Sequence, residues 1–209
     1  MTVRYEPARL AFCELASALK RESELHTDVF RCLELLLTRY NTQIYENRFI
    51  VGGVAERIIG AAFVALGKTT KSLGVHVTRS DISVGDVKLS VKGSFRPNPR
   101  DIRLVNVMGD SILATWDEPT IFVISGLGIG YADPALLPNS TRRASDAITL
   151  PMRPLKDLWE TNPALLYPMN LPYSLNDKAS SDIASRIVAD EILRYSKKLK
   201  PFDTRTHED

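Results

Sequence analysis

The sequence has little cysteine, and only Cys13 and Cys32 occur among its 209 residues. Both lie in apolar stretches with helical spacing, and they lack the paired Cys/His spacing of a zinc site. We interpret them as reduced thiols packed in the core. The sequence therefore gives no support for a zinc module.

Long apolar runs are also absent. No run of about 18 apolar residues occurs, so we expect no membrane span. The first ten residues carry Arg4, Glu6 and Arg9 where a signal peptide would need an apolar stretch. These features predict a soluble, cytoplasmic protein.

Charge of one sign is not in large excess either, because the formal net charge is only +2. A weakly basic balance neither requires nor excludes nucleic acid, since a DNA-binding protein needs a local basic face rather than a basic total. A hydrophobic content of 44% is enough for one good core. We therefore expect a single domain over residues 1–209.

The N-terminal third of the sequence predicts helices. Residues 7–40 show apolar spacing of two helices, with a break at residues 21–23. Residues 41–49 are predicted to be irregular. A strongly apolar helix is predicted over residues 55–66, entered through Gly52-Gly53 and ended by Gly67.

The pattern then changes to that of strands. Extended runs on both sides of Gly85-Asp86 predict a β-hairpin, with further strands at residues 102–107 and 120–125. The glycine-rich run at residues 126–130 lacks the spacing of a dinucleotide fingerprint, which favours a tight loop. This order of elements predicts an α/β or α+β domain with a central mixed β-sheet flanked by helices.

We divide this domain into four regions. They are N-terminal helices in residues 1–50, a catalytic core in 51–126, an irregular wrapping or recognition region in 131–175, and a C-terminal helix in 180–200. Ser180 or Ser181 is expected to cap the last helix, where Ile192 and Tyr195 share an apolar face with earlier residues.

The hairpin carries the residues with chemical interest. Asp81 is placed on its first strand, and Ser90 and Lys92 on its second. Residues two apart in a strand leave the same face, so Ser90 and Lys92 should lie together beside Asp81. A carboxylate that holds a metal ion, next to an amine that orients water or stabilises a pentacovalent phosphate, is what phosphodiester hydrolysis needs.

At these residues the sequence resembles the PD-(D/E)xK nuclease superfamily, which includes many type II restriction endonucleases. Asp81 matches the family aspartate, and Ser90-Val91-Lys92 matches the (D/E)xK element. The resemblance covers residues 52–95 and implies a restriction-endonuclease-like core, a Mg²⁺ cofactor and the carbonyl of Val91 as a metal ligand. Ser80 replaces the usual proline, and Ser90 replaces the usual second acid.

The missing acid must then come from elsewhere in the fold. Glu56 is the first choice, because it is a charged residue within the apolar helix before the hairpin. Asp101 and Asp110, downstream of Lys92, are the alternatives. Asp86 is less suited to replace Asp81, because a residue in the tight turn lies away from Ser90-Val91-Lys92.

Basic residues surround the predicted site and suggest contacts to DNA phosphates. Those nearest the hairpin, together with one serine, are predicted to bind DNA: Arg79, Ser94, Arg96, Arg100 and Arg103. Arg142 and Arg143 form a further basic pair.

These residues indicate a type II restriction endonuclease that cuts double-stranded DNA at a short palindrome and acts as a homodimer. Two other functions remain open. One is a structure-selective or repair nuclease of the same superfamily. The other is a non-catalytic DNA-binding protein whose site has degenerated at Ser90.

Overall fold

Three helices begin the chain in the computed structural model, which describes residues 3–40, 45–73, 80–106, 115–144, 146–174 and 192–200. A short 3-10 turn η1 (Val3–Tyr5) leads into α1 (Glu6–Arg21), and α2 (Ser23–Arg39) follows. The two helices separate at Glu22, whose extended backbone caps α1 by donating to the carbonyl of Ala18. The predicted pair of helices and the break between them are confirmed.

Helix α3 (Tyr45–Ala65) is longer than the sequence predicted. The irregular stretch predicted for residues 41–49 is wrong at least from Tyr45 onward, and Gly52-Gly53 lie inside the helix. Ile50, Val51 and Val54 are buried on both sides of these glycines. Tertiary burial therefore outweighs the low helix propensity of glycine. The end is as predicted, with a positive φ at Gly67.

A six-stranded mixed sheet forms the centre of the fold. Its order is β1 (Thr70–Ser72), β2 (Ile82–Val84), β3 (Val87–Ser94), β5 (Thr120–Ile124), β6 (Gly128–Ala132) and β9 (Leu166–Pro168). Among the described strands of this sheet, only the β3–β5 pair is parallel. Every residue of β5 is buried, so this strand, predicted at residues 120–125, is covered on both faces.

Residues 131–175 were predicted to be irregular, but the part of this region that the structure describes is largely regular. They contribute the end of β6, β7 (Arg142–Arg143), β8 (Ala147–Pro151), α4 (Met152–Thr161), the 3-10 turn η2 (Pro163–Leu165) and β9. A second sheet with the order β4-β8-β7 includes β4 (Asp101–Asn106). Pro154 lies in the first turn of α4 and Pro163 begins η2, positions where a missing backbone N–H costs little.

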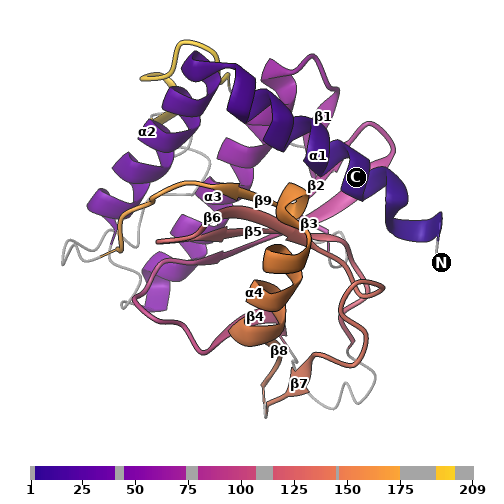
Figure 1. Ribbon diagram of the computed structural model, residues 1–209. Coiled ribbons are helices and arrows are strands. Elements are labelled where there is room, and N and C mark those ends of the chain that lie inside the picture. The colour runs from indigo at the N-terminus through magenta and orange to yellow at the C-terminus, as the bar shows by residue number, and fades with distance from the viewer. Residues whose placement is uncertain are drawn as a thin grey trace, which may run out of the picture.

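The two faces of the central sheet are covered differently. Helices α1 and α2 lie on one side, and α4 with the second sheet lies on the other (Figure 1). Phe12 of α1 stacks on Tyr131, with 5.7 Å between ring centroids. On the other side Trp159 of α4 meets Phe122 at 6.1 Å and covers Gly130, where any Cβ would overlap its indole.

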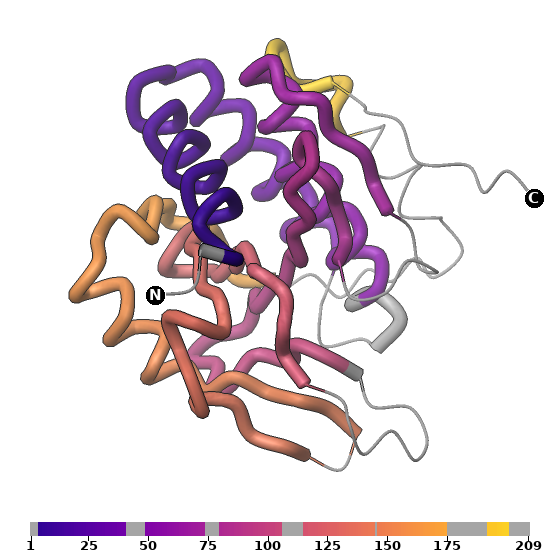
Figure 2. Tube along the Cα trace, turned by 90° about the vertical axis from the view of Figure 1, so that its right-hand side faces the viewer, coloured from indigo at the N-terminus to yellow at the C-terminus, as the bar shows by residue number. Residues whose placement is uncertain are grey.

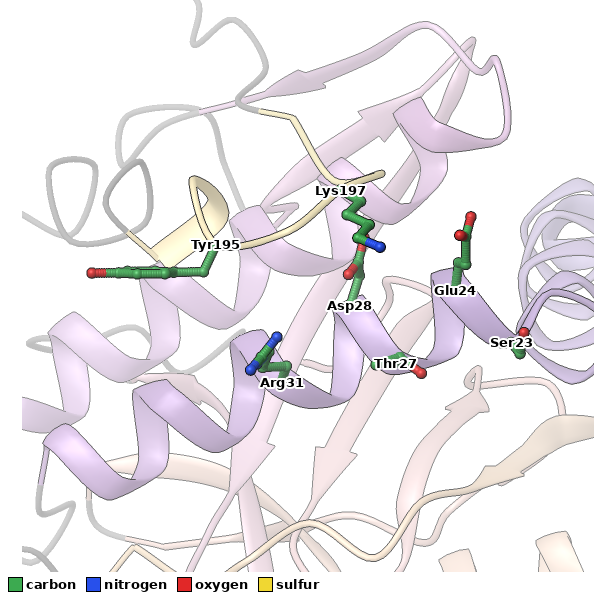
Figure 3. A pocket seen from close by; sticks show the side chains of 7 residues that line it. All are labelled: Ser23, Glu24, Thr27, Asp28, Arg31, Tyr195 and Lys197. Carbon is green, nitrogen blue, oxygen red and sulfur yellow. The ribbon is translucent and has the colours of Figure 1, made fainter.

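The described part of the C-terminal region packs against α2. The helix predicted for residues 180–200 falls mostly outside the described residues; Ile192 and Leu193 are helical, and the chain turns at Arg194–Tyr195. Side-chain bonds compete with the helix here, because Asp28 accepts from Ser196 Oγ and Lys198 N, both at 2.6 Å. Tyr195 and Lys197 line a pocket with residues of α2 (Figure 3).

Among the described residues, no helix is both long enough and apolar enough to cross a membrane.

Candidate active site

The β2–β3 hairpin holds Asp81 by its backbone. Gly85 takes a positive φ of 56° in the turn, and the register pairs Ile82 with Leu89. Asp81 immediately precedes β2, yet its N–H donates to the carbonyl of Leu89 at 2.9 Å. Its own carbonyl accepts from the N–H of Leu73 at 3.0 Å. The carboxylate therefore starts from a backbone fixed between two neighbouring strands.

Three donors from β3 converge on one oxygen of Asp81. Oδ2 accepts hydrogen bonds from Ser90 Oγ at 2.8 Å, from Val91 N at 2.6 Å and from Lys92 Nζ at 3.1 Å. Among the described residues, no donor reaches Oδ1. The side chains of Asp81 and Lys92 keep 21% and 24% exposure, so this ion pair opens to the surface.

The same bonds define the parts played by Ser90 and Val91. Ser90 is buried and uses its hydroxyl proton on Asp81, so it orients the carboxylate. The N–H of Val91 points to the β2 side of β3, whereas the N–H of Ser90 points to the β5 side, toward Pro119. Because the N–H and C=O of one strand residue point to the same neighbouring strand, the carbonyl of Val91 is directed toward the Asp81 side.

Glu56 of α3 is the other acid near this pair. Helix α3 packs against β1, β2 and β3, and the Glu56 side chain is half-buried. Burial and the Asp81 carboxylate raise the pKa of Glu56, while Lys92 and Arg57 act in the opposite direction. Glu56 is thus close enough to Asp81 for the two carboxylates to repel each other.

These groups fit a hard divalent cation. Among the described residues, no group of three or more His, Cys, Asp and Glu side chains forms a ready-made metal site. Mg²⁺ does not require one, since it keeps several waters and is commonly held by one or two carboxylates. Two mutually repelling carboxylates and a backbone carbonyl supply that donor set, and a cation would relieve the repulsion.

The residues predicted to bind DNA lie on β3, on β4 and in the connection between these strands, apart from one outside the described residues. Ser94 ends β3 and accepts from Ser125 N at 3.0 Å through its backbone carbonyl. Arg96 and Arg100 are exposed between β3 and β4, and Arg103 lies on β4, where it pairs with Asp146. Arg79 lies outside the described residues.

Of the alternative acids considered from the sequence, the structure describes Asp101 and Asp86. Asp101 starts β4 and pairs with Arg96 at 4.0 Å, and it is not among the groups that shift the pKa of Glu56. Asp110 lies outside the described residues. Asp86 lies in the hairpin turn and lines a pocket with Lys88 and Arg4. Of the acids considered from sequence, the structure therefore brings Glu56 to Asp81 and Lys92.

Glu118 is a neighbour of the site that the sequence did not reveal. Its Oε2 accepts from Ser80 Oγ at 2.9 Å, next to Asp81, and the following Pro119 carbonyl accepts from Ser90 N at 2.9 Å. The segment before β5 thus supports both strands that carry the site. Glu118-Pro119 directly before a buried strand is too common a pattern to signal this role.

Comparison with solved structures bears on the fold of the chain. No model of a known protein family and no curated protein sequence matches the chain. A solved structure described as a restriction endonuclease in complex with substrate DNA is similar, with a TM-score of 0.59 and 15% sequence identity. The match covers 80% of this chain and 94% of that one. The chain therefore has a restriction-endonuclease-like fold, as the sequence predicted.

Proposed function

We propose that this protein is a Mg²⁺-dependent endonuclease that cuts double-stranded DNA, in the manner of a type II restriction endonuclease. The observation that carries the proposal is the Asp81–Lys92 pair at 3.1 Å with Glu56 beside it. The fold supports it, because the similar structure is that of a restriction endonuclease with its substrate DNA.

Each residue has a definite task in this proposal. Asp81 Oδ1, Glu56 and the carbonyl of Val91 would hold Mg²⁺, which supplies charge neutralisation at the scissile phosphate. Lys92 orients the attacking water and stabilises negative charge on the phosphate. Ser90 Oγ and the Val91 N–H hold Asp81 by its Oδ2, which keeps Oδ1 facing the metal position.

The exposed basic residues after β3 would hold the DNA. Arg96 and Arg100 are exposed in the connection that leaves β3 two residues beyond Lys92, and Arg103 follows on β4. Their charges suit phosphate contacts, and Arg can also read guanine edges in the major groove. We also predict that Arg79 and Ser94 contact the DNA. A homodimer is proposed because a two-fold DNA site is matched by a two-fold protein.

The direct test is cleavage of a long duplex DNA by the purified protein with Mg²⁺, followed by sequencing of the ends. Discrete fragments with one shared end sequence are expected. Random fragments, or cleavage confined to branched DNA, would contradict sequence-specific restriction and favour the structure-selective alternative. Absence of cleavage under all divalent-metal conditions would favour a non-catalytic DNA-binding protein.

The relocated acid has its own test. Glu56→Gln removes one anionic ligand with little change in volume, so cleavage should fall and more Mg²⁺ should be needed. Asp101→Asn is the matched control and should cleave normally. Restoring the usual acid with Ser90→Glu should partly rescue Glu56→Ala. The reverse pattern, with Asp101→Asn inactive and Glu56→Gln normal, would place the acid downstream.

A further inference from the structure

The second sheet carries exposed arginines on its two edge strands. Arg142 and Arg143 make up β7, and both are exposed at the edge of the sheet. Arg103 lies on β4 at the other edge. Asp146 pairs with Arg103, and Asp101 lies nearest Arg96. Arginine therefore outnumbers aspartate across the three strands and the turn between β7 and β8.

The register aligns two of these arginines in one row. Arg103 pairs with Thr149, and Thr149 pairs with Arg142. Directly paired residues of adjacent strands leave the same face, so Arg103, Thr149 and Arg142 cross the sheet together. The neighbouring pair, Ile102 and Leu150, is buried and leaves the opposite face. Two strand spacings, roughly 10 Å, separate the two arginine backbones.

This sheet is fixed to the core on the same side as Lys92. Lys92 pairs with Phe122, and Phe122 pairs with Gly130, so the side chains of Lys92 and Phe122 leave the face of the central sheet on which Gly130 is open. Trp159 of α4 covers that face, and α4 continues directly from β8. Both views place the second sheet on the side away from α1 and α2 (Figures 1 and 2).

We propose that the outward face of the β4–β8–β7 sheet extends the DNA interface. In this proposal Arg142 contacts a DNA phosphate beyond the phosphates that Arg96 and Arg100, in the connection after β3, contact. This inference rests on the proposed nuclease function and adds a second contact surface to it. The partner chemistry is a duplex phosphate backbone, because the guanidinium of Arg142, exposed at the edge of the sheet, suits charge-assisted hydrogen bonds to phosphate oxygens.

A structural explanation for the same arginines must be separated from this one. Charged side chains on an edge strand prevent it from pairing with other sheets. Arg142→Glu separates the two explanations, because it keeps a charge on the edge while it repels phosphate. Lys20→Glu is the matched control, since Lys20 is exposed on α1, on the other side of the central sheet.

The experiment measures binding of the full chain to a fluorescent duplex without Mg²⁺, over a series of salt concentrations. Arg142→Glu should weaken binding by about tenfold or more, and the slope of log affinity against log salt should fall by about one. Lys20→Glu should bind like the wild type. Light scattering should find Arg142→Glu as free of aggregates as the wild type.

The outcomes separate the two proposals. If wild type cleaves DNA with Mg²⁺ while Arg142→Glu and Lys20→Glu bind equally well, this inference is overturned and the nuclease function stands. If wild type binds duplex DNA through Arg142 but never cleaves it, the interface stands and catalysis is overturned. Failure of wild type to bind duplex DNA overturns both, and an Arg142→Glu variant that binds normally without aggregating supports the edge-protection role.

Discussion

Two aspartates of this molecule, Asp81 and Asp133, each gather several donors, yet they form opposite kinds of site. Asp133 has a fully buried side chain, and both of its oxygens are used. Oδ1 accepts from the N–H groups of Ala135 and Leu136 at 2.9 and 3.0 Å. Oδ2 accepts from Tyr131 and from Arg9 at 3.0 and 3.1 Å.

Asp81 differs in three respects. All three of its donors bind Oδ2, its side chain keeps 21% exposure, and a second acid lies beside it. The number of hydrogen bonds therefore does not distinguish a structural carboxylate from a candidate catalytic one. An oxygen to which no described residue donates, access from the surface and a second carboxyl group nearby do so.

The largest expected effect contrasts the two aspartates directly. Asp81→Asn should lower the cleavage rate about a thousandfold, since losing a metal ligand removes several kcal/mol of transition-state stabilisation. Its melting temperature should change little, because repulsion with Glu56 and attraction to Lys92 are lost together. Asp133→Asn should do the reverse, with a loss of about 2–3 kcal/mol in the free energy of unfolding.

Cleavage assays and denaturant unfolding of both variants measure these changes. Normal cleavage by Asp81→Asn would remove Asp81 from the site and return attention to Asp86.

The two cations that pair with these aspartates should differ in the same way. Lys92→Ala should reduce cleavage about a hundredfold, the usual cost of removing one donor that stabilises developing charge. Arg9→Ala should leave cleavage unchanged per folded molecule but destabilise the protein, because Asp133 would remain buried without its cation. Rates normalised to the folded fraction from circular dichroism separate the two, and a Lys92→Ala variant with full activity would refute the assignment.

The smallest expected effect concerns protons and metal. Because the pKa of Glu56 is raised, the folded metal-free protein binds this proton more tightly than the unfolded chain does. Its free energy of unfolding should therefore gain a contribution as the pH falls through the folded pKa. Binding of Mg²⁺ requires the carboxylate, so its affinity should rise with pH up to that pKa, by up to about tenfold per pH unit.

Isothermal titration calorimetry in buffers of different ionisation enthalpy measures the released proton. Glu56→Gln is the control and should release less. Equal proton release by Glu56→Gln and wild type would show that Glu56 is not the group that titrates.

The hairpin was predictable because strand geometry is local. A period of two places Ser90 and Lys92 on one face, and a Gly-Asp turn folds them toward Asp81, so the hydrogen bonds to Asp81 follow from a few residues. The helices of residues 6–39 were predictable for the same reason, through their apolar spacing. Prediction of the acid on α3 depended on the resemblance to a nuclease family.

The errors arose where tertiary contacts decide the structure. The start of α3 was set too late because Gly52-Gly53 suggest a helix start, and only packing shows that the helix continues through them. Strands β7 and β8 were missed because two- and five-residue strands without clear alternation carry almost no pattern. The bond from Ser80 to Glu118 joins residues 38 apart, which no local period can indicate.

The bonds of Asp28 to Ser196 and Lys198 have a consequence for how the protein is made. Asp28 is only 6% exposed in the folded protein. It accepts hydrogen bonds from Ser196 and Lys198, which follow it in the chain by 168 and 170 positions. At a translation rate of about 5–20 residues per second, α2 leaves the ribosome roughly ten to thirty seconds before those partners exist. During that interval Asp28 can stay hydrated only if its end of α2 is not yet closed, so this end of the helix is sealed only after Ser196 and Lys198 have been made.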